Sequence, residues 1–286
     1  MTNLLTAIIN IVNNNQLSLT SYFKSNNRIN AVGDGLEFFI KDAFCNSFNL
    51  EIKQKSVNVY PQFFSYEGNS NNPPDLILKD GDAVEVKKIE SLKTAIALNS
   101  SYPKAQLFAN DSMITNACRS CENAWKVKDI IYTIGVVPKQ QNRLKFLWFV
   151  YGDCFAAEKQ VYERIRNGIC DGVNQIAGIE FAETNELARV NRVDPLGITY
   201  LRVRGMWGIE NPISIYNYLD LEYDESCNFQ MIAIMQESKY LSFSKQHRQA
   251  IENLADTNQI KIRDIKIKSP NNPAKILNSK IIIYKK

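Results

Sequence analysis

Residues 72–88 restrict the fold more than any other stretch of this sequence. Two short apolar runs, residues 74–79 and 83–89, flank the dipeptide Asp80-Gly81. Such a dipeptide between two apolar runs is a strong signal for a tight turn between antiparallel strands. The sequence therefore predicts a β-hairpin here.

The second strand of this hairpin has two unlike faces. Side chains alternate along a strand, so Val84 and Val86 point to one side while Glu85 and Lys87 point to the other. The valines belong in a core. The two charged side chains then lie next to each other on the opposite face.

The register of the hairpin decides whether Asp75 joins them. A two-residue loop would pair Leu76 with Glu85 and place Asp75 among the valines, where an unpaired carboxylate costs several kcal/mol. A three-residue loop, residues 79–81 with Gly81 in the left-handed conformation, pairs Asp75 with Glu85 instead. We therefore expect the three-residue loop.

An Asp, a Glu and a Lys on one face can perform metal-assisted hydrolysis. Two neighbouring carboxylates repel each other, and a hard divalent cation relieves that repulsion. Oxygen ligands select Mg²⁺ or Mn²⁺ over zinc. The metal polarises a phosphoryl oxygen and activates water, and Lys87 can orient that water or offset developing charge. Spacing alone leaves a second interpretation open, an ordinary surface hairpin with a charged outer face.

The remaining pattern predicts an α/β (α+β) fold with a mixed β-sheet flanked by helices. Apolar residues recur at helical spacing in residues 3–13 and 32–48, and residues 157–168 and 244–255 also look helical. The further strands are expected at residues 130–137, 144–151 and 198–203.

Several classes of function are excluded by composition. His247 is the single histidine in 286 residues, so no site with two or three imidazoles is available, and we expect His247 to lie at a solvated helix start. No phosphate-binding glycine loop is present. The pair Cys118 and Cys121 lacks a second pair at zinc-site spacing. No apolar run reaches the roughly 18 residues of a membrane span, and the first residues do not resemble a signal peptide, so we expect no membrane partner and a cytoplasmic location.

Positive charge is concentrated in two places. Residues 259–286 hold eight basic side chains and one aspartate, a local charge of +7 in a chain of net charge +4. Their alternation with isoleucines predicts a strand with a basic face, either solvated or bound to a polyanion. Four arginines surround the strand predicted at 198–203, and arginine is the usual reader of guanine. A solvated or salt-bridged face is the alternative. The candidate DNA-binding residues are Arg189, Arg192, Arg202, Arg204 and Lys104.

The motifs resemble one known family. Pro74-Asp75, nine further residues and Glu85-Val86-Lys87 match the PD-(D/E)xK signature of the restriction-endonuclease-like fold. The surrounding sequence is similar to that of the NgoPII family of type II restriction endonucleases over roughly residues 1–215. The segments that carry this resemblance are Gly33-Asp34-Gly35-Leu36-Glu37, Asn72-Pro73-Pro74-Asp75, Glu85-Val86-Lys87-Lys88-Ile89-Glu90-Ser91, Leu98-Asn99-Ser100-Ser101, Phe181-Ala182-Glu183-Thr184, Arg189-Val190-Asn191-Arg192-Val193-Asp194-Pro195-Leu196 and Arg202-Val203-Arg204-Gly205-Met206-Trp207-Gly208-Ile209-Glu210-Asn211-Pro212.

The resemblance implies a site and an assembly. Asp75 and Glu85 would be metal ligands, Lys87 the water-orienting base, and Glu37, on the preceding helix, a further metal ligand. The family implies a Mg²⁺-dependent homodimer (Mn²⁺ can substitute) that cuts both strands of double-stranded DNA at a short palindrome, GGCC-like by resemblance. A cognate DNA methyltransferase would be its genetic partner in a prokaryotic host.

The sequence thus predicts one nuclease domain over residues 1–286, with a catalytic core at about 25–155 and recognition and C-terminal elements at about 156–286. The function expected is a type II restriction endonuclease that leaves 5′-phosphates. Two alternatives remain at this point: a structure-selective nuclease of the same fold, such as a repair enzyme or junction resolvase, and a non-catalytic DNA-binding module.

Overall fold

A computed structural model of the chain describes residues 1–14, 16–22, 28–69, 72–139, 141–176, 180–182 and 187–286. In this part of the chain, the strands are β1 (Phe64–Asn69), β2 (Asn72–Leu78), β3 (Ala83–Ile89), β4 (Ile96–Asn99), β5 (Gln106–Phe108), β6 (Val127–Val136), β7 (Phe146–Tyr151), β8 (Glu180–Phe181), β9 (Ala188–Asn191), β10 (Leu201–Val203), β11 (Trp207–Ile209), β12 (Gln230–Gln236), β13 (Lys261–Lys268) and β14 (Ile276–Lys285). The helices are α1 (Leu4–Asn13), the 3-10 turn η1 (Thr20–Tyr22), α2 (Arg28–Cys45), α3 (Ile52–Asn58), α4 (Tyr60–Phe63), α5 (Asn116–Arg119), α6 (Gly152–Phe155), α7 (Lys159–Asn174), α8 (Pro212–Ile215), α9 (Glu237–Ser242) and α10 (Lys245–Asp256).

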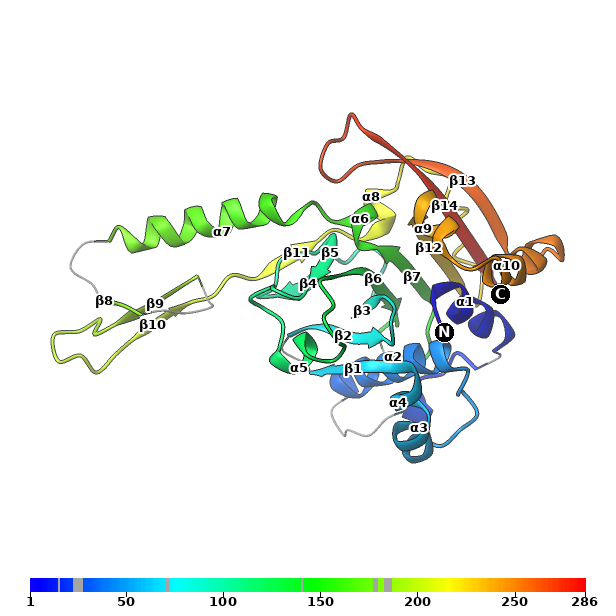
Figure 1. Cartoon of the computed structure of the whole chain (residues 1–286), viewed down its shortest axis with the longest axis horizontal. Helices are drawn as coiled ribbons and strands as arrows, with labels where there is room; N and C mark the ends of the chain where they lie inside the picture. The colour runs from blue at the N-terminus through cyan, green and yellow to red at the C-terminus, as the bar shows by residue number, and fades with distance from the viewer. Residues whose placement is uncertain (15, 23–27, 70–71, 140, 177–179, 183–186) are drawn as a thin grey trace.

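One large mixed sheet organises the body of the molecule (Figure 1). Among the described residues it holds nine strands in the order β1-β2-β3-β6-β7-β12-β14-β13, with β5 added along β6. The pairs β3–β6 and β7–β12 are parallel, whereas the other pairs are antiparallel. Helices flank this sheet, so the predicted fold class is confirmed. The last three strands of the chain complete the same sheet that carries the hairpin.

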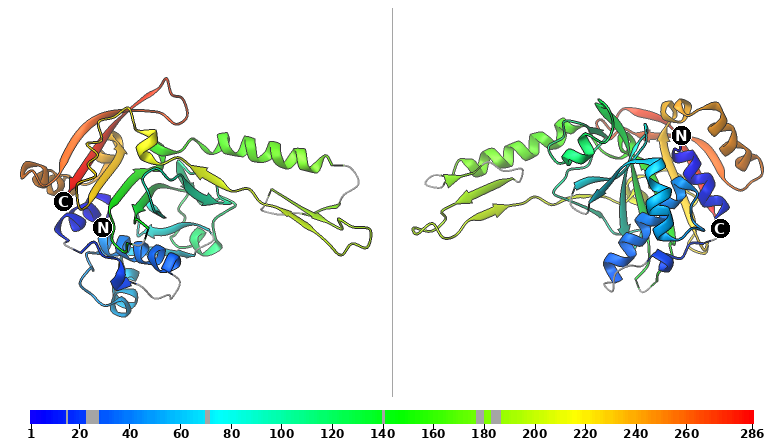
Figure 2. Two further views of the ribbon diagram at one scale, coloured as in Figure 1. Left: turned by 180° about the vertical axis from the view of Figure 1, so that it is seen from behind. Right: turned by 60° about the horizontal axis from the view of Figure 1, so that its bottom comes forward.

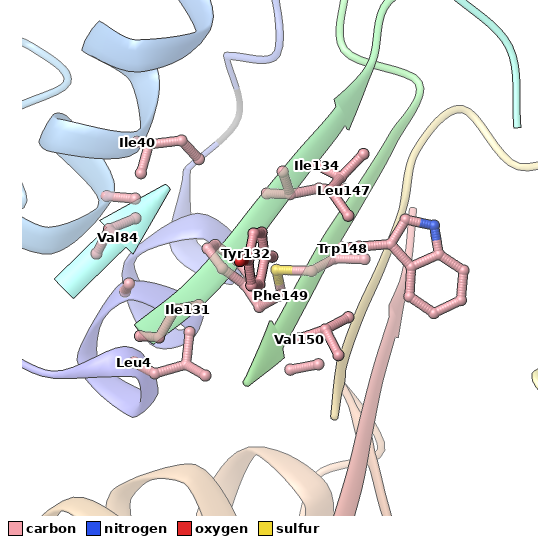
Figure 3. Close-up of a cluster of buried hydrophobic side chains, with 14 of the residues drawn as sticks. Leu4, Ile40, Val84, Ile131, Tyr132, Ile134, Leu147, Trp148, Phe149 and Val150 are labelled. Atoms are coloured by element: carbon pink, nitrogen blue, oxygen red, sulfur yellow. The ribbon is translucent and has the colours of Figure 1, made fainter. Parts of the chain in front are cut away.

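The core forms where helices α1 and α2 meet the central strands. Asn3 caps α1 by accepting a hydrogen bond from the Thr6 backbone, and the apolar side of α1 packs on α2. Side chains of β6 and β7 join residues such as Leu4 of α1 and Ile40 of α2 in one buried cluster (Figure 3). Both central strands are apolar along most of their length because both of their faces are covered.

His247 lies in the first turn of α10, as the sequence predicts, but it also joins two helices. Asn3 Nδ2 donates to His247 Nδ1 across 2.8 Å, and the same ring nitrogen lies 3.0 Å from Ser244 Oγ. The single imidazole therefore links the start of α1 to the start of α10, and the geometry gives it a structural role.

A long projection extends from the body, and we call its described residues, 159–176, 180–182 and 187–204, the arm. It consists of helix α7 and the small sheet β10-β9-β8, and both figures show it reaching far beyond the main sheet (Figures 1 and 2). Three aromatic rings fasten its base: Tyr162 of α7 stacks on Tyr102 at 5.5 Å, and Trp207 of β11 meets both rings edge-on. Strand β11 then returns the chain to the body by pairing with β4.

None of the described helices is both long enough and apolar enough to cross a membrane.

Candidate active site

The β2–β3 hairpin has the three-residue loop that the sequence predicts. Leu76 pairs with Val84, and the Leu78 amide donates to the Asp82 carbonyl. The loop is therefore residues 79–81, and the same register brings Asp75 opposite Glu85.

The conformation predicted for the loop is wrong in one detail. Asp80, with φ of 53°, occupies the left-handed region in place of Gly81. An aspartate tolerates this region better than most residues, and the Asp80 amide is held by Glu122 Oε1 at 2.9 Å. This contact from a distant segment gives the turn a partner that the local sequence does not reveal.

Asp75 is held against the neighbouring strand. Its Oδ2 accepts a hydrogen bond from the Val86 amide at 2.6 Å. Burial, together with the nearby Glu85 carboxylate, raises the pKa of Asp75 to about 8, although Lys87 and the Val86 amide act in the opposite direction. A carboxyl group in such surroundings needs additional positive charge to remain ionised at neutral pH.

Glu85 and Lys87 lie beside Asp75 on the same face. Lys87 Nζ is 2.6 Å from Glu85 Oε1 and 3.9 Å from Asp75 Oδ2. Burial acts to lower the pKa of Lys87, but the two carboxylates outweigh it and raise the pKa. The second oxygen of Glu85, Oε2, is buried and has no hydrogen-bond partner. A buried carboxylate oxygen without a donor is costly, so this atom marks a place for a missing ligand.

This donor set fits a hard divalent cation. Asp75 and Glu85 supply carboxylate oxygens, the ligands that Mg²⁺ and Mn²⁺ prefer. A cation between them would satisfy Glu85 Oε2 and would supply the positive charge that Asp75 lacks. The arrangement can therefore hold a metal and place a lysine next to it.

Glu37, the third ligand implied by the resemblance, is placed nearby but is engaged elsewhere. Its carboxylate lies 2.8 Å from Lys41 Nζ, one turn along α2, and Lys41 also contacts Glu67 of β1 at 2.9 Å. The charge of Glu37 still contributes to the raised pKa values of Asp75 and Lys87. Among the described residues, no group of three or more acidic, thiol or imidazole side chains is arranged to hold a metal ion. Glu37 would have to exchange Lys41 for a metal to join Asp75 and Glu85.

Lys41 is the residue of this site that the sequence reasoning missed. It is buried, and burial acts to lower its pKa, but Glu37 and Glu67 outweigh this and raise it. The spacing of four residues between Glu37 and Lys41 is the signal that would have found the pair, since residues i and i+4 are neighbours on a helix. Its contact with Glu67 depends on the packing of α2 against β1 and has no local signal.

Comparison with known proteins identifies the family. The NgoPII restriction endonuclease family matches residues 2–268. The chain belongs to this family. It is 50% identical over 284 residues to "Type II restriction enzyme NgoPII" of Neisseria gonorrhoeae. These 284 residues make up 99% of each of the two chains. No solved structure matches the chain.

Membership of the NgoPII family makes the chain an endonuclease of a restriction system, a hydrolase that acts on DNA at specific sites. The family match confirms the resemblance that the sequence motifs indicate. It also extends well beyond residue 215.

In this NgoPII-family chain, the four candidate arginines all lie on the arm. Arg189 of β9 and Arg202 of β10 are directly paired across the strands, so their side chains leave the same face of the small sheet. The Arg189 guanidinium also lies 5.0 Å from the centre of the Tyr200 ring. Arg192 follows β9 in a left-handed conformation, and Arg204 follows the end of β10.

Lys104 is not with these arginines. It is buried at 4% exposure in the body, where its Nζ lies 3.1 Å from Asp111 Oδ2. Burial lowers the pKa of Lys104, and Asp111 only partly offsets this. The burial and the ion pair argue against a phosphate contact, since Lys104 would reach a phosphate only if this part of the body opened.

The basic C-terminal segment forms the edge pair β13–β14 of the large sheet. Acidic side chains engage several of its cations: Lys261 lies 2.7 Å from Glu222 of the body, and Lys280 lies 2.5 Å from Asp264 of the neighbouring strand β13. The predicted alternation is present, with Ile267 buried between two exposed lysines. These ion pairs favour the interpretation that this face is solvated over the interpretation that it binds a polyanion.

Proposed function

We propose that this chain hydrolyses phosphodiester bonds in double-stranded DNA at a short palindrome, GGCC-like by resemblance, using Mg²⁺ held by Asp75 and Glu85. The observation that carries this proposal is the convergence of Asp75, Glu85 and Lys87 on one face, with Glu85 Oε2 buried and unpartnered. Mn²⁺ would substitute because it accepts the same oxygen ligands.

In this mechanism the side chains have separate tasks. Asp75 and Glu85 would hold the Mg²⁺, which would supply Lewis acidity toward the phosphoryl oxygen and toward a water molecule. The Val86 amide fixes the Asp75 carboxylate, and the β3 backbone fixes Glu85 on the same face. Lys87 orients the attacking water and offsets the charge that develops on the phosphoryl oxygens. Attack in line with the leaving 3′-oxygen would leave a 5′-phosphate and a 3′-hydroxyl. Glu37 would be a further ligand after release from Lys41.

The arm would carry DNA recognition, while the rest of the same domain carries cutting. Arg189 and Arg202 form a paired basic surface on a projecting sheet, the geometry needed to reach guanine edges in the major groove. Arg192 follows the end of β9, and Arg204 follows the end of β10. In a prokaryotic cytoplasm, such an enzyme requires a cognate methyltransferase to protect host DNA.

The test of this function is digestion of unmethylated phage DNA by the purified chain with Mg²⁺. We expect discrete fragments with ends that a DNA ligase rejoins, as 5′-phosphates require. Absence of cutting on every DNA tried contradicts the proposal. Cutting confined to branched DNA would instead indicate a structure-selective nuclease.

We also propose a homodimer, because one site per chain must cut two strands. A row of apolar side chains on α7, Val161, Ile165 and Ile169, is between 42% and 48% exposed. Arg164 and Asp171 flank this row on one side, so two copies of α7 packed antiparallel would bring each Arg164 to the Asp171 of the other copy. This charge complementarity favours a second copy as the partner of the row.

The oligomeric state tests the dimer directly. In sedimentation velocity we expect Ile165→Glu to shift the chain from dimer to monomer, since the substitution buries a charge at the centre of the interface. Asn167→Glu, on the opposite side of α7, should remain dimeric. A wild-type monomer, or an Ile165→Glu dimer, contradicts the interface.

A further inference from the structure

The loop at the far end of the arm, residues 192–200, is held in one shape by a single carboxylate. Asp194 accepts hydrogen bonds from the backbone amides of Leu196 at 3.0 Å, Ile198 at 3.1 Å and Thr199 at 2.7 Å, and also from the Thr199 hydroxyl. These bonds lower the pKa of Asp194 to about 2. Gly197, with φ of 70°, supplies the left-handed residue that closes the turn.

This ordered loop presents apolar side chains to solvent. Leu196 is 83% exposed and Ile198 is 73% exposed. The loop joins β9 to β10 at the end of the projection, as both views show (Figures 1 and 2). A large apolar side chain fixed in water at such a point costs free energy, and patches of this kind usually mark an interaction site.

The charge around the loop identifies the partner. Residues 187–206 contain four arginines and one aspartate, a local charge of +3. The paired side chains of Arg189 and Arg202 lie on the strands that lead into the loop. A second copy of this segment would carry the same charge and be repelled, whereas the phosphates of a DNA duplex complement it.

We propose that Leu196 inserts between adjacent base pairs of bound DNA, as an apolar wedge that partly unstacks one step and bends the duplex. This inference rests on the proposed DNA-binding role of the arm. The hydrogen bonds to Asp194 fix the backbone of the loop that carries Leu196 before DNA binds. Little conformational entropy of the loop is therefore lost on insertion. The arginines on the adjoining strands hold the backbone on either side of the opened step.

Such a wedge adds sequence preference without a hydrogen bond to a base. The free energy of unstacking depends on the step that is opened, and pyrimidine–purine steps open most readily. Bending repays this cost by bringing more of the duplex against the protein. Leu196 would therefore contribute to specificity together with the arginines.

The experiment compares four variants with the wild-type chain: Leu196→Ser removes the wedge, Asp194→Ala loosens the turn, Arg202→Ala weakens the basic surface, and Leu241→Ser is the control. Leu241 is a leucine of α9 that is 54% exposed and lies outside the arm. Each protein is mixed, with Ca²⁺ in place of Mg²⁺, with end-labelled duplexes that contain the cleaved site. The duplexes carry 2-aminopurine at successive positions in and beside the site. Affinity, end-to-end energy transfer and 2-aminopurine fluorescence are recorded.

With the wild type and Leu241→Ser, we expect fluorescence to rise at one step and energy transfer to report a bend. Leu196→Ser should abolish both signals and weaken site binding about tenfold, with binding to unrelated DNA unchanged. Asp194→Ala should weaken both signals while the leucine is still present.

Two results separate failure of the wedge from failure of the DNA-binding arm. If Arg202→Ala weakens binding but Leu196→Ser retains the bend and the fluorescence, only the wedge is contradicted. If Arg202→Ala and Leu196→Ser both bind like the wild type, the arm does not bind DNA and both proposals are wrong.

Discussion

Lys87 Nζ lies 2.6 Å from Glu85 Oε1, two residues along the same strand and on the same face. Asp75 is opposite Glu85 on the next strand, and the three charged groups share a half-buried space. Alternation along β3 and the three-residue loop are sufficient to bring them together. The site therefore follows from the geometry of one hairpin.

Lys87→Met should lower DNA cleavage by about 100-fold to 10,000-fold, because the variant keeps the stem of the side chain but loses the group that orients water. The matched control is Lys88→Met on the same strand. Lys88 faces the other side and pairs with Glu90 at 3.1 Å. Initial rates of plasmid cleavage with saturating Mg²⁺ measure the effect. Equal losses of rate in the two variants would contradict a specific role for Lys87 in cleavage.

Gly68→Ala should reduce cleavage without touching a charged residue. A Cβ at Gly68 would lie 2.4 Å from the Pro74 carbonyl oxygen and 3.0 Å from that of Asp75, so β1 must move away from β2 where β2 carries Asp75. A displacement of about 1 Å can cost about 100-fold in rate. Gly33→Ala on α2 is the control, since a Cβ there meets no atom within 4 Å. Cleavage rates and thermal unfolding are measured together, and a folded Gly68→Ala chain with the wild-type rate contradicts the prediction.

Lys55→Met should destabilise the fold by about 3–5 kcal/mol, because it leaves a buried carboxylate without its counter-ion. Lys55 and Asp42 are almost completely buried and form an ion pair. Asp42 also accepts hydrogen bonds from the hydroxyls of Tyr22 and Tyr60. Urea denaturation measures the loss. Lys53→Met on the exposed side of α3 should change the free energy of unfolding by less than about 0.5 kcal/mol.

Lys239→Met should destabilise the chain by about 2–3 kcal/mol near neutral pH, and this difference should shrink in acid and in alkali. Lys239 lies 2.6 Å from Asp82 and 2.7 Å from Asp129. Burial acts to raise the pKa of Asp129, but hydrogen bonds from Lys239 and Gln106 outweigh it and lower the pKa. Burial acts to lower the pKa of Lys239, but Asp82 and Asp129 raise it.

The sign of each shift fixes the pH window. Stability from the lowered pKa of Asp129 is complete above its ordinary value of 3.8 and is lost as the pH falls through the folded value. Stability from the raised pKa of Lys239 is complete below 10.5 and is lost as the pH rises through the folded value. Urea denaturation of both proteins across this range measures the difference, and a constant difference at every pH would contradict the ion-pair explanation.

The hairpin and the helices around it were predictable because local rules determine them. The burial cost of Asp75 was enough to choose the loop length, and the structure confirms that choice. Helix α2 ends within three residues of the predicted end at residue 48. These features depend on periodicity, turn chemistry and the cost of burying charge.

The other features of the fold could not be predicted from the sequence, because they depend on contacts between residues far apart in the chain. The insertion of β12 between β7 and β14 joins segments about 80 residues apart, and no local pattern encodes that order. The arm was not predicted either, since α7 has the amphipathic pattern of a helix on a core yet has no buried residue. Lys104 is a candidate DNA-binding residue from the sequence, because its partner Asp111 meets it only through the folded loop.

The most direct test of the central claim is Mn²⁺ binding to the metal-depleted chain, followed by electron paramagnetic resonance without DNA. We expect the wild type and Lys88→Met to bind Mn²⁺ at the Asp75 and Glu85 carboxylates, and Asp75→Asn and Glu85→Gln to lose that binding while remaining folded by circular dichroism. If both carboxylate variants bind Mn²⁺ as tightly as the wild type, the cation is held elsewhere and the account of this site is wrong.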